Sequence, residues 1–372
     1  MKILFVASVY RHLTAFHIPY IKYFQENGFE VWAAGIGEED KAVLNSLNVK
    51  CVDIPFSRNP FKLQNITAYR KIKKLVNKEN FKIIHVHTPV ASFLTRMAFN
   101  KGKNKSGKMI YTAHGFHFFN GAPKRNWIIY YTAEKLIAKW TDQLITINEE
   151  DFRNAHKLLP TNKISYVHGV GVETISNILT EKEKLSLKKT LNLPKESLVI
   201  SYIAELNYNK NHKFLLRNWK KLKQKIPQLE LLIVGYGENE KELKEYVNIE
   251  QLKGIHFLGF RKDVSELLQI TDIVALLSYR EGLPKSIMEA MVIGIPCVVT
   301  DTRGLRDLIK SNVNGFIVKH EDDIELMKAF ETLAYSEQMR EQMGKTSKKI
   351  IESYLLENVL EEYKFIYNQL LK

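Results

Sequence analysis

The sequence predicts an α/β protein made of two doubly wound domains. The chain has 372 residues, which is longer than a single hydrophobic core usually reaches. Apolar runs with the length of buried strands alternate with segments of helical periodicity, a pattern typical of parallel sheets covered by helices. Ligands of such sheets bind at the carboxyl ends of the strands, so the two domains are expected to face each other across a central cleft that holds the site.

The first domain is expected over residues 1–170. Its predicted strands are KILFVAS, EVWAAG, KIIHVHT, MIYTAH and QLITIN, with helices near 17–27 and 68–78. The N-terminal run soon turns charged and lacks a small-residue cleavage site. It therefore indicates a first strand and not a signal peptide.

The second domain is expected over residues 171–350. Its predicted strands are SLVISYIAEL, LELLIVGYG, IHFLGF, DIVALLS and IPCVVT. The charged stretch 181–194 lies where the domains should join and is either a linker or the helix that opens the second domain. Residues 351–372 have helical periodicity, and this last helix is expected to pack back toward the N-terminal domain.

The positive charge is concentrated in the first half of the chain. Residues 1–170 contain 25 Lys and Arg against 12 Asp and Glu, whereas residues 171–372 contain 30 against 29. This asymmetry indicates an anionic partner for the first domain: a membrane surface, a phosphorylated acceptor or a nucleic acid. No nucleic-acid recognition motif accompanies the basic strings 69–75 and 100–108, so nucleic acid is not expected.

Aromatic and cationic residues share one short region of the first domain. This composition suits an interface with anionic lipid. The predicted contacts there are Phe118, Phe119, Lys124, Arg125 and Trp127. No apolar run approaches the roughly twenty residues of a membrane span. The protein is therefore expected in the cytoplasm, peripherally bound to the inner face of the plasma membrane.

Two glutamates flank a predicted strand-to-helix turn in the second domain. Glu281 follows the run DIVALLS, and Pro284 has the fixed φ that suits the first turn of a helix containing Glu289. The free amides of that helix end form an anion site suited to a diphosphate. Two carboxylates beside a phosphate site would bind hydroxyls, and Lys210, after an earlier strand, would add positive charge.

These residues resemble a known family. Glu281 to Glu289 within EGLPKSIMEAM is similar to the E-x7-E motif of the retaining GT-B glycosyltransferases of family four. HGVGVE, AELNYNKN, GYG and NVNGFIV are similar, in order, to four further motifs of that family. The strings YTAHGFHFFNGAPKRNW, HTP and RGLRDLI resemble its bacterial branch that builds capsular and exopolysaccharide repeat units on a lipid carrier.

The resemblance implies a function and a set of site residues. It implies a metal-independent, cofactor-free, retaining transfer of a hexose or N-acetylhexosamine from a UDP-sugar to an undecaprenyl-diphosphate-linked saccharide. The implied catalytic residues are His114, which would face the donor sugar, Glu281 and Lys210. The implied donor-binding residues are Glu205, Lys210, Gly235, Arg280, Gly282, Leu283, Pro284, Glu289 and Arg303.

The chain departs from the family pattern at two places. Ala204 and Glu205 stand where the family has Gly and Arg, so a carboxylate replaces one phosphate-binding cation, and Arg280 and Arg303 are the expected replacements. The segment SVYRHLTAFH lacks the family's glycine-rich loop, and its Arg11 and His17 are expected to contact the acceptor instead.

Two alternative functions stay open. A sugar-nucleotide epimerase shares the architecture, and a catalytically silent sugar-nucleotide-binding partner is consistent with Glu205. His85 and His87 alternate on one strand, but without a third ligand they are expected to be packed or hydrogen-bonded. The acidic triplet 321–323 is expected to cap a helix. No metal is predicted.

Overall fold

The computed structural model describes residues 1–102 and 107–372, and the chain divides into two compact units. The first unit comprises Met1–Gly171 together with Leu356–Lys372, and the second comprises Val172–Leu355. Residues 103–106 of the basic string 100–108 lie outside the described part. Within that part, no helix is both long and apolar enough to cross a bilayer.

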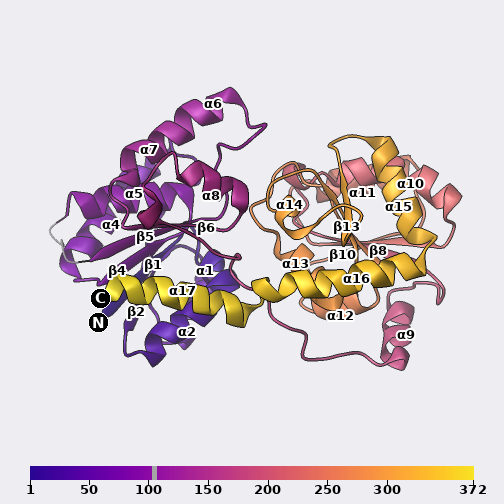
Figure 1. Ribbon diagram of the computed structural model, residues 1–372, viewed down its shortest axis with the longest axis horizontal. Helices are drawn as coiled ribbons and strands as arrows, with labels where there is room; N and C mark the ends of the chain where they lie inside the picture. The colour runs from indigo at the N-terminus through magenta and orange to yellow at the C-terminus, as the bar shows by residue number, and fades with distance from the viewer. Residues whose placement is uncertain (103–106) are drawn as a thin grey trace. The chain divides into compact units, whose positions relative to one another are not determined.

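The first unit contains a parallel sheet with the strand order β3-β2-β1-β4-β5-β6-β7 (Figure 1). Its strands are β1 (Lys2–Val6), β2 (Glu30–Gly35), β3 (Lys50–Asp53), β4 (Ile83–Val86), β5 (Lys108–Ala113), β6 (Gln143–Thr146) and β7 (Ile164–Tyr166). Its helices are α1 (Tyr10–Phe16), α2 (Ile18–Glu26), α3 (Glu38–Ser46), α4 (Gln64–Lys78), α5 (Pro89–Asn100), α6 (Lys124–Asn126), the π-helical turn η1 (Trp127–Tyr131), α7 (Thr132–Ala138), α8 (Glu149–Ala155), η2 (Thr161–Lys163) and α17 (Leu356–Leu371).

Alternation along β1 places the two helical layers of the first unit. Leu4 and Val6 pack into a core with residues of α4 and α5. Phe5, on the opposite face, contacts Phe24 of α2 with ring centroids 6.0 Å apart. Successive side chains of a strand point to opposite faces, so a buried parallel sheet is apolar on both sides. Figure 1 shows α2 and α17 on the face opposite α4 and α5.

The last helix, α17, belongs to the first unit. The Tyr363 ring packs edge-on against Tyr20, and the Tyr367 ring packs against Phe24. The Tyr367 hydroxyl lies 2.9 Å from Nδ1 of His85, a hydrogen bond that joins the helix to β4. The chain thus returns to the first unit at its end.

The second unit contains a parallel sheet with the order β10-β9-β8-β11-β12-β13. Its strands are β8 (Leu198–Ile203), β9 (Leu229–Val234), β10 (Ile255–Gly259), β11 (Ile273–Leu276), β12 (Cys297–Thr300) and β13 (Gly315–Val318). Its helices are α9 (Glu181–Thr190), η3 (Tyr208–Lys210), α10 (His212–Lys225), α11 (Glu240–Ile249), α12 (Val264–Gln269), α13 (Lys285–Ile293), α14 (Leu305–Leu308), α15 (Asp323–Ala334), α16 (Glu337–Ile351) and η4 (Glu352–Tyr354).

Two helix starts in the second unit follow from capping chemistry. Thr180 and Glu183 form a reciprocal capping box at the start of α9, so the charged stretch 181–190 is a helix of this unit. The Asp322 carboxylate accepts hydrogen bonds from the amides of Ile324 and Glu325 at the start of α15. The prediction of a cap at 321–323 is confirmed.

Candidate active site

The strand order places a topological switch point in each sheet. In the second unit the chain runs outward from β8 to β9 and later returns on the other side of β8 as β11. Open α/β sheets bind ligands in the crevice at the carboxyl ends of the strands flanking such a point. Lys210 follows β8 and Glu281 follows β11. The fold thus brings two of the predicted catalytic residues to one switch point.

Lys210 and Glu281 form an ion pair. The Nζ of Lys210 lies 2.6 Å from Oε1 of Glu281, with only 20% and 9% of the two side chains exposed. The buried Tyr202 holds their loops together: its hydroxyl donates to the Lys210 carbonyl and accepts from the Leu277 amide at 2.7 Å. The pair is therefore held at the ends of two adjacent strands.

Arg303 and Gly304 contact the backbone of the loop that carries Glu281. Nε of Arg303, which is 3% exposed, donates to the carbonyl of Glu281 at 3.1 Å. Gly304 has φ of +72°, and a Cβ at this position would lie 1.9 Å from the carbonyl oxygen of Gly282. Only glycine fits such a close backbone approach at positive φ. Arg303 thus positions the loop, and its Nε is directed at protein and not at the crevice.

The glycines of the GYG segment, residues 235–237, also allow two backbone segments to lie close together. A Cβ at Gly235 would lie 2.0 Å from the carbonyl oxygen of Ala204, and a Cβ at Gly237 would lie 2.4 Å from that of Leu206. The two glycines let the loop after β9 pack directly on the loop after β8. Glu205, between these contacts, is exposed, as is Arg280.

Glu289 lies in α13, as the sequence predicts, and lines a pocket that Glu281 does not line. It lines a pocket of about 180 Å³ together with Glu173, Ser265 and Lys285, and neither Lys210 nor Glu281 is among the lining residues. Burial raises the pKa of the Glu289 carboxyl, and Lys285, whose Nζ lies 3.6 Å away, opposes this. Pro284 is the N-cap, so the free amides of α13 begin one residue later than predicted.

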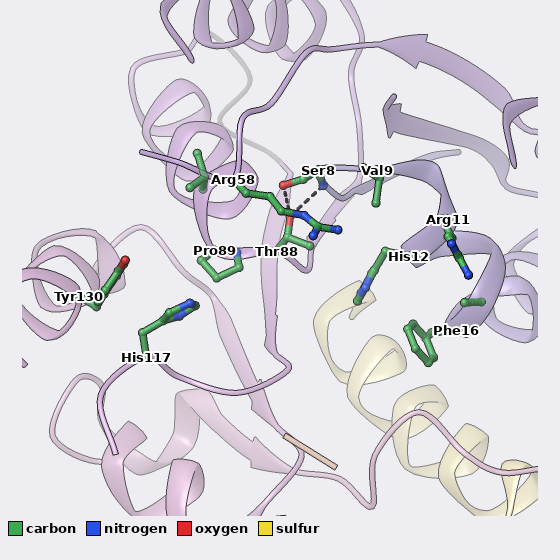
Figure 2. A pocket seen from close by; sticks show the side chains of 12 residues that line it. Ser8, Val9, Arg11, His12, Phe16, Arg58, Thr88, Pro89, His117 and Tyr130 are labelled. Atoms are coloured by element: carbon green, nitrogen blue, oxygen red, sulfur yellow. Dashed lines mark hydrogen bonds between the residues drawn. The ribbon is translucent and has the colours of Figure 1, made fainter. Parts of the chain in front are cut away.

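The first unit has its switch point between β1 and β4, where a pocket of about 510 Å³ opens. Ser8, after β1, and Thr88, after β4, are joined by two hydrogen bonds of 2.8 Å. Figure 2 shows the Arg58 side chain extending over these two residues. Further residues of the wall are Arg11, His12, Phe16, Pro89, His117 and Tyr130.

Four histidines meet beside this pocket. Nε2 of His114, the predicted catalytic histidine, lies 3.2 Å from Nε2 of His12 and 3.3 Å from Nδ1 of His87. The His17 ring centroid is 3.9 Å from that of His87. Burial, reinforced by the charge of Arg58, lowers the pKa of His12 to about 4. Burial also holds the pKa values of His17, His87 and His114 well below 6.5.

Two residues expected to contact acceptor or membrane are buried. Phe118 has no exposed surface and stacks on Phe116 at 4.5 Å, so the prediction that Phe118 contacts the membrane is wrong. Its aromatic ring fills the core beneath the segment that follows. His17 is 1% exposed and so has no surface to offer to an acceptor.

The α6–α7 segment (residues 124–138) instead presents aliphatic side chains to solvent. Ile128, Ile129 and Leu136 are 70%, 46% and 64% exposed. The predicted residues Lys124 and Arg125 are also exposed, whereas Phe119 and Trp127 are half-buried and joined by a hydrogen bond from the Trp127 indole to the Phe119 carbonyl. Sequence reasoning missed the aliphatic residues because aromatic rings gave the stronger signal.

A buried ion pair anchors this segment. Arg96 of α5 binds both carboxylate oxygens of Glu134 in α7, at 3.0 and 2.8 Å, and its guanidinium lies over the Tyr111 ring. This pair fixes which face of α7 points inward. The opposite face is therefore the exposed one.

Comparison with known proteins identifies the family of this chain. Residues 2–148 match the family profile described as glycosyl transferase 4-like, and residues 183–350 match that of glycosyl transferases group 1. EpsD of Bacillus subtilis (strain 168), which is named as a glycosyltransferase, is 36% identical over 99% of this chain and 96% of its own length. This chain belongs to the GT-B glycosyltransferases.

Further similarities of this glycosyltransferase differ in extent. The UDP-Gal:α-D-GlcNAc-diphosphoundecaprenol α-1,3-galactosyltransferase of Escherichia coli is 29% identical over 71% of this chain and 69% of its own length. The crystal structure of Anabaena Alr3699/HepE in complex with UDP and glucose superposes with a TM-score of 0.81, at 18% identity, over 99% of this chain and all of that one. At 18% identity, the similarity to the Anabaena protein shows a shared fold.

Proposed function

We propose that this glycosyltransferase moves a hexose or N-acetylhexosamine from a UDP-sugar, with retention, to an undecaprenyl-diphosphate-linked saccharide in capsular or exopolysaccharide biosynthesis. The observation that carries the proposal is the buried Lys210–Glu281 pair at the switch point of the second sheet, next to the start of α13. The name of the Escherichia coli relative, which includes both UDP-Gal and a diphosphoundecaprenol acceptor, supports the substrate classes.

Each donor-site residue has a role suited to its position. Lys210 and the free amides at the start of α13 would stabilise the departing diphosphate. Glu281 would accept hydrogen bonds from donor-sugar hydroxyls, and Glu289, in its own pocket, would bind the ribose diol. We also assign a catalytic role to His114.

Retention follows if the acceptor attacks on the face that the diphosphate leaves. The acceptor hydroxyl would form the new bond to the anomeric carbon as the bond to the diphosphate oxygen breaks. Its proton would pass to the leaving phosphate. Such a step needs charge stabilisation of the diphosphate, which Lys210 and the helix end supply, so we propose that no divalent metal is required there.

The pocket between β1 and β4 fits an anionic acceptor. Arg11 and Arg58 line it from two different segments, and Phe16, Val90 and Tyr130 add apolar surface. Guanidinium groups are well suited to phosphate oxygens. We assign the diphosphate of the carrier lipid to this pocket.

The α6–α7 segment fits a peripheral contact with the inner face of the plasma membrane. Its exposed aliphatic residues are accompanied by exposed lysines and arginine, a combination that binds anionic bilayer surfaces. Flotation with vesicles containing phosphatidylglycerol should retain the protein, and Ile128→Ser should weaken retention. Equal binding to neutral vesicles would argue against this contact.

A transfer assay tests the activity. The purified protein is incubated in EDTA with a panel of UDP-sugars and an undecaprenyl-diphosphate-linked saccharide, and the linkage of any product is read by NMR. We expect an α-linked product from one donor, abolished in Glu281→Gln. The exposed Glu245 of α11 offers the matched control Glu245→Gln, which should transfer as the wild type does.

Other outcomes would point to the alternatives. Nucleotide binding without transfer would favour a silent partner, for which the exposed Glu205 is the motivating feature. Conversion of the UDP-sugar to its epimer without any acceptor would favour an epimerase.

A further inference from the structure

The four-histidine cluster is built from three chain segments that follow β1, β4 and β5 at the carboxyl edge of the first sheet. His12 lies in α1, His17 between α1 and α2, His87 directly after β4, and His114 directly after β5. One ring nitrogen from each residue can be chosen so that all four lie within 4.8 Å of one another. Residues 75 positions apart in the chain, such as His12 and His87, thus converge on one point.

The distances between the nitrogens match a metal site. In tetrahedral zinc sites the metal–nitrogen bonds are about 2.0–2.1 Å, which places ligand nitrogens roughly 3.3 Å apart. The His114 Nε2 is 3.2 Å from the His12 nitrogen and 3.3 Å from the His87 nitrogen. Two nitrogen pairs of the cluster therefore already have the spacing that one ion requires.

Hydrogen bonding alone leaves this cluster unsatisfied. Nε2 of His114 faces two imidazole nitrogens, but a single ring proton can be donated to only one of them. Nε2 of His17 is buried and has no hydrogen-bond partner among the described residues, and the same holds for Nε2 of His87, whose other ring nitrogen, Nδ1, is the one that faces His114. Buried polar atoms are otherwise almost always paired, so orphaned nitrogens point to a ligand.

The neighbouring His85 shows what a structural histidine looks like in this core. Its Nδ1 is bonded to the Tyr367 hydroxyl and its Nε2 to the Thr112 hydroxyl, at 2.9 and 2.8 Å. Both nitrogens are satisfied, and His85 is not part of the cluster. The prediction of packed or hydrogen-bonded histidines is confirmed for His85, and His87 is also buried, but Nε2 of His87 has no partner among the described residues.

An ion can reach the cluster through the pocket between β1 and β4. His12 belongs both to the cluster and to the pocket wall. The other face of the cluster packs against Phe5, whose ring stacks on that of His87. The cluster therefore faces the pocket on one side and an apolar side chain of the core on the other.

We propose that His12, His17, His87 and His114 bind one divalent transition-metal ion of the zinc class. Neutral imidazole is the commonest metal ligand in proteins, and a site of nitrogen donors selects zinc, cobalt or copper over magnesium and calcium. An ion on Nε2 of His114 would also block the catalytic role proposed for that side chain. This last consequence rests on the function proposed above, and the binding itself does not.

Cobalt binding tests the site without any activity measurement. The full chain, produced without a polyhistidine tag and stripped with EDTA, is titrated with Co²⁺ and followed by its visible absorption, and Zn²⁺ is then added. We expect one Co²⁺ per chain, bands typical of tetrahedral nitrogen coordination, and their loss on displacement by Zn²⁺. Zn²⁺ should also raise the melting temperature, because it binds the folded state.

Matched variants locate the ion. His17→Gln should weaken binding about tenfold or more, whereas His156→Gln, at an exposed histidine directly after α8, should leave it unchanged. If His17→Gln fails to fold, His12→Gln, at the margin of the cluster, replaces it. Absence of saturable binding in the wild type, or equal affinity in the wild type and the cluster variant, would overturn the proposal.

Discussion

Removal of Lys210 is expected to destabilise the second unit through the partner that it leaves behind. In Lys210→Met the Glu281 carboxylate, with 9% of its side chain exposed, loses the ammonium group 2.6 Å away. Breaking a buried ion pair on one side costs about 3–5 kcal/mol. Because one-fifth of the Lys210 side chain is exposed, water can partly replace it, so the lower end, about 3 kcal/mol, is expected.

The double variant Lys210→Met/Glu281→Gln separates pairing from packing. With no buried charge left unpaired, it should recover at least half of the lost stability. The assay is hydrogen exchange with mass spectrometry across a urea series, read on peptides covering β8 and β11, because the two units need not unfold together. A single variant that costs under about 0.5 kcal/mol would refute the reasoning, as would strictly additive effects.

Two further perturbations probe the loops and the helix of the same unit. Gly304→Ala places a Cβ against the Gly282 carbonyl at positive φ and should lower the free energy of unfolding in urea by about 3 kcal/mol or more. The control Gly259→Ala, also at positive φ but with open space around it, should lower it by about 1 kcal/mol. Equal losses in the two variants would contradict the close approach. Because burial raises the pKa of Glu289 above 4.5, its neutral form favours folding, and the wild type should lose stability as pH rises from about 4.5 through that raised pKa. Glu289→Gln lacks this loss, so its stability advantage, measured by thermal melting at several pH values, should grow across that window; an advantage independent of pH would show that the carboxyl does not titrate there.

The sequence predicted those structural features that depend on a short stretch of the chain. The alternation of apolar runs and helical segments predicted two parallel-sheet domains, and the fold confirms this. The position of Glu281 in a strand-to-helix loop and of Glu289 within α13 followed from the turn residues between them. These features depend on neighbours within about ten residues, and one segment therefore contains all the information needed.

Exposure within the α6–α7 segment could not be read in the same way. Leu136 and Ile137 are adjacent apolar residues of α7, yet Leu136 is 64% exposed and Ile137 only 2%. The difference is set by the Arg96–Glu134 pair, which fixes the inward face of α7 across a sequence separation of 38 residues. Composition alone does not contain that contact.

The sequence by itself determined the class of fold, the order of its elements and the loop that carries Glu281, because burial and turn chemistry are local. Only the tertiary structure decided that Lys210 meets Glu281 and that His12 and His17 meet His87 and His114. Those side-chain contacts depend on which strands become neighbours: β8 lies beside β11, and β1 lies beside β4. Such pairings are long-range crossovers fixed by packing of the whole sheet, and no spacing within the chain expresses them.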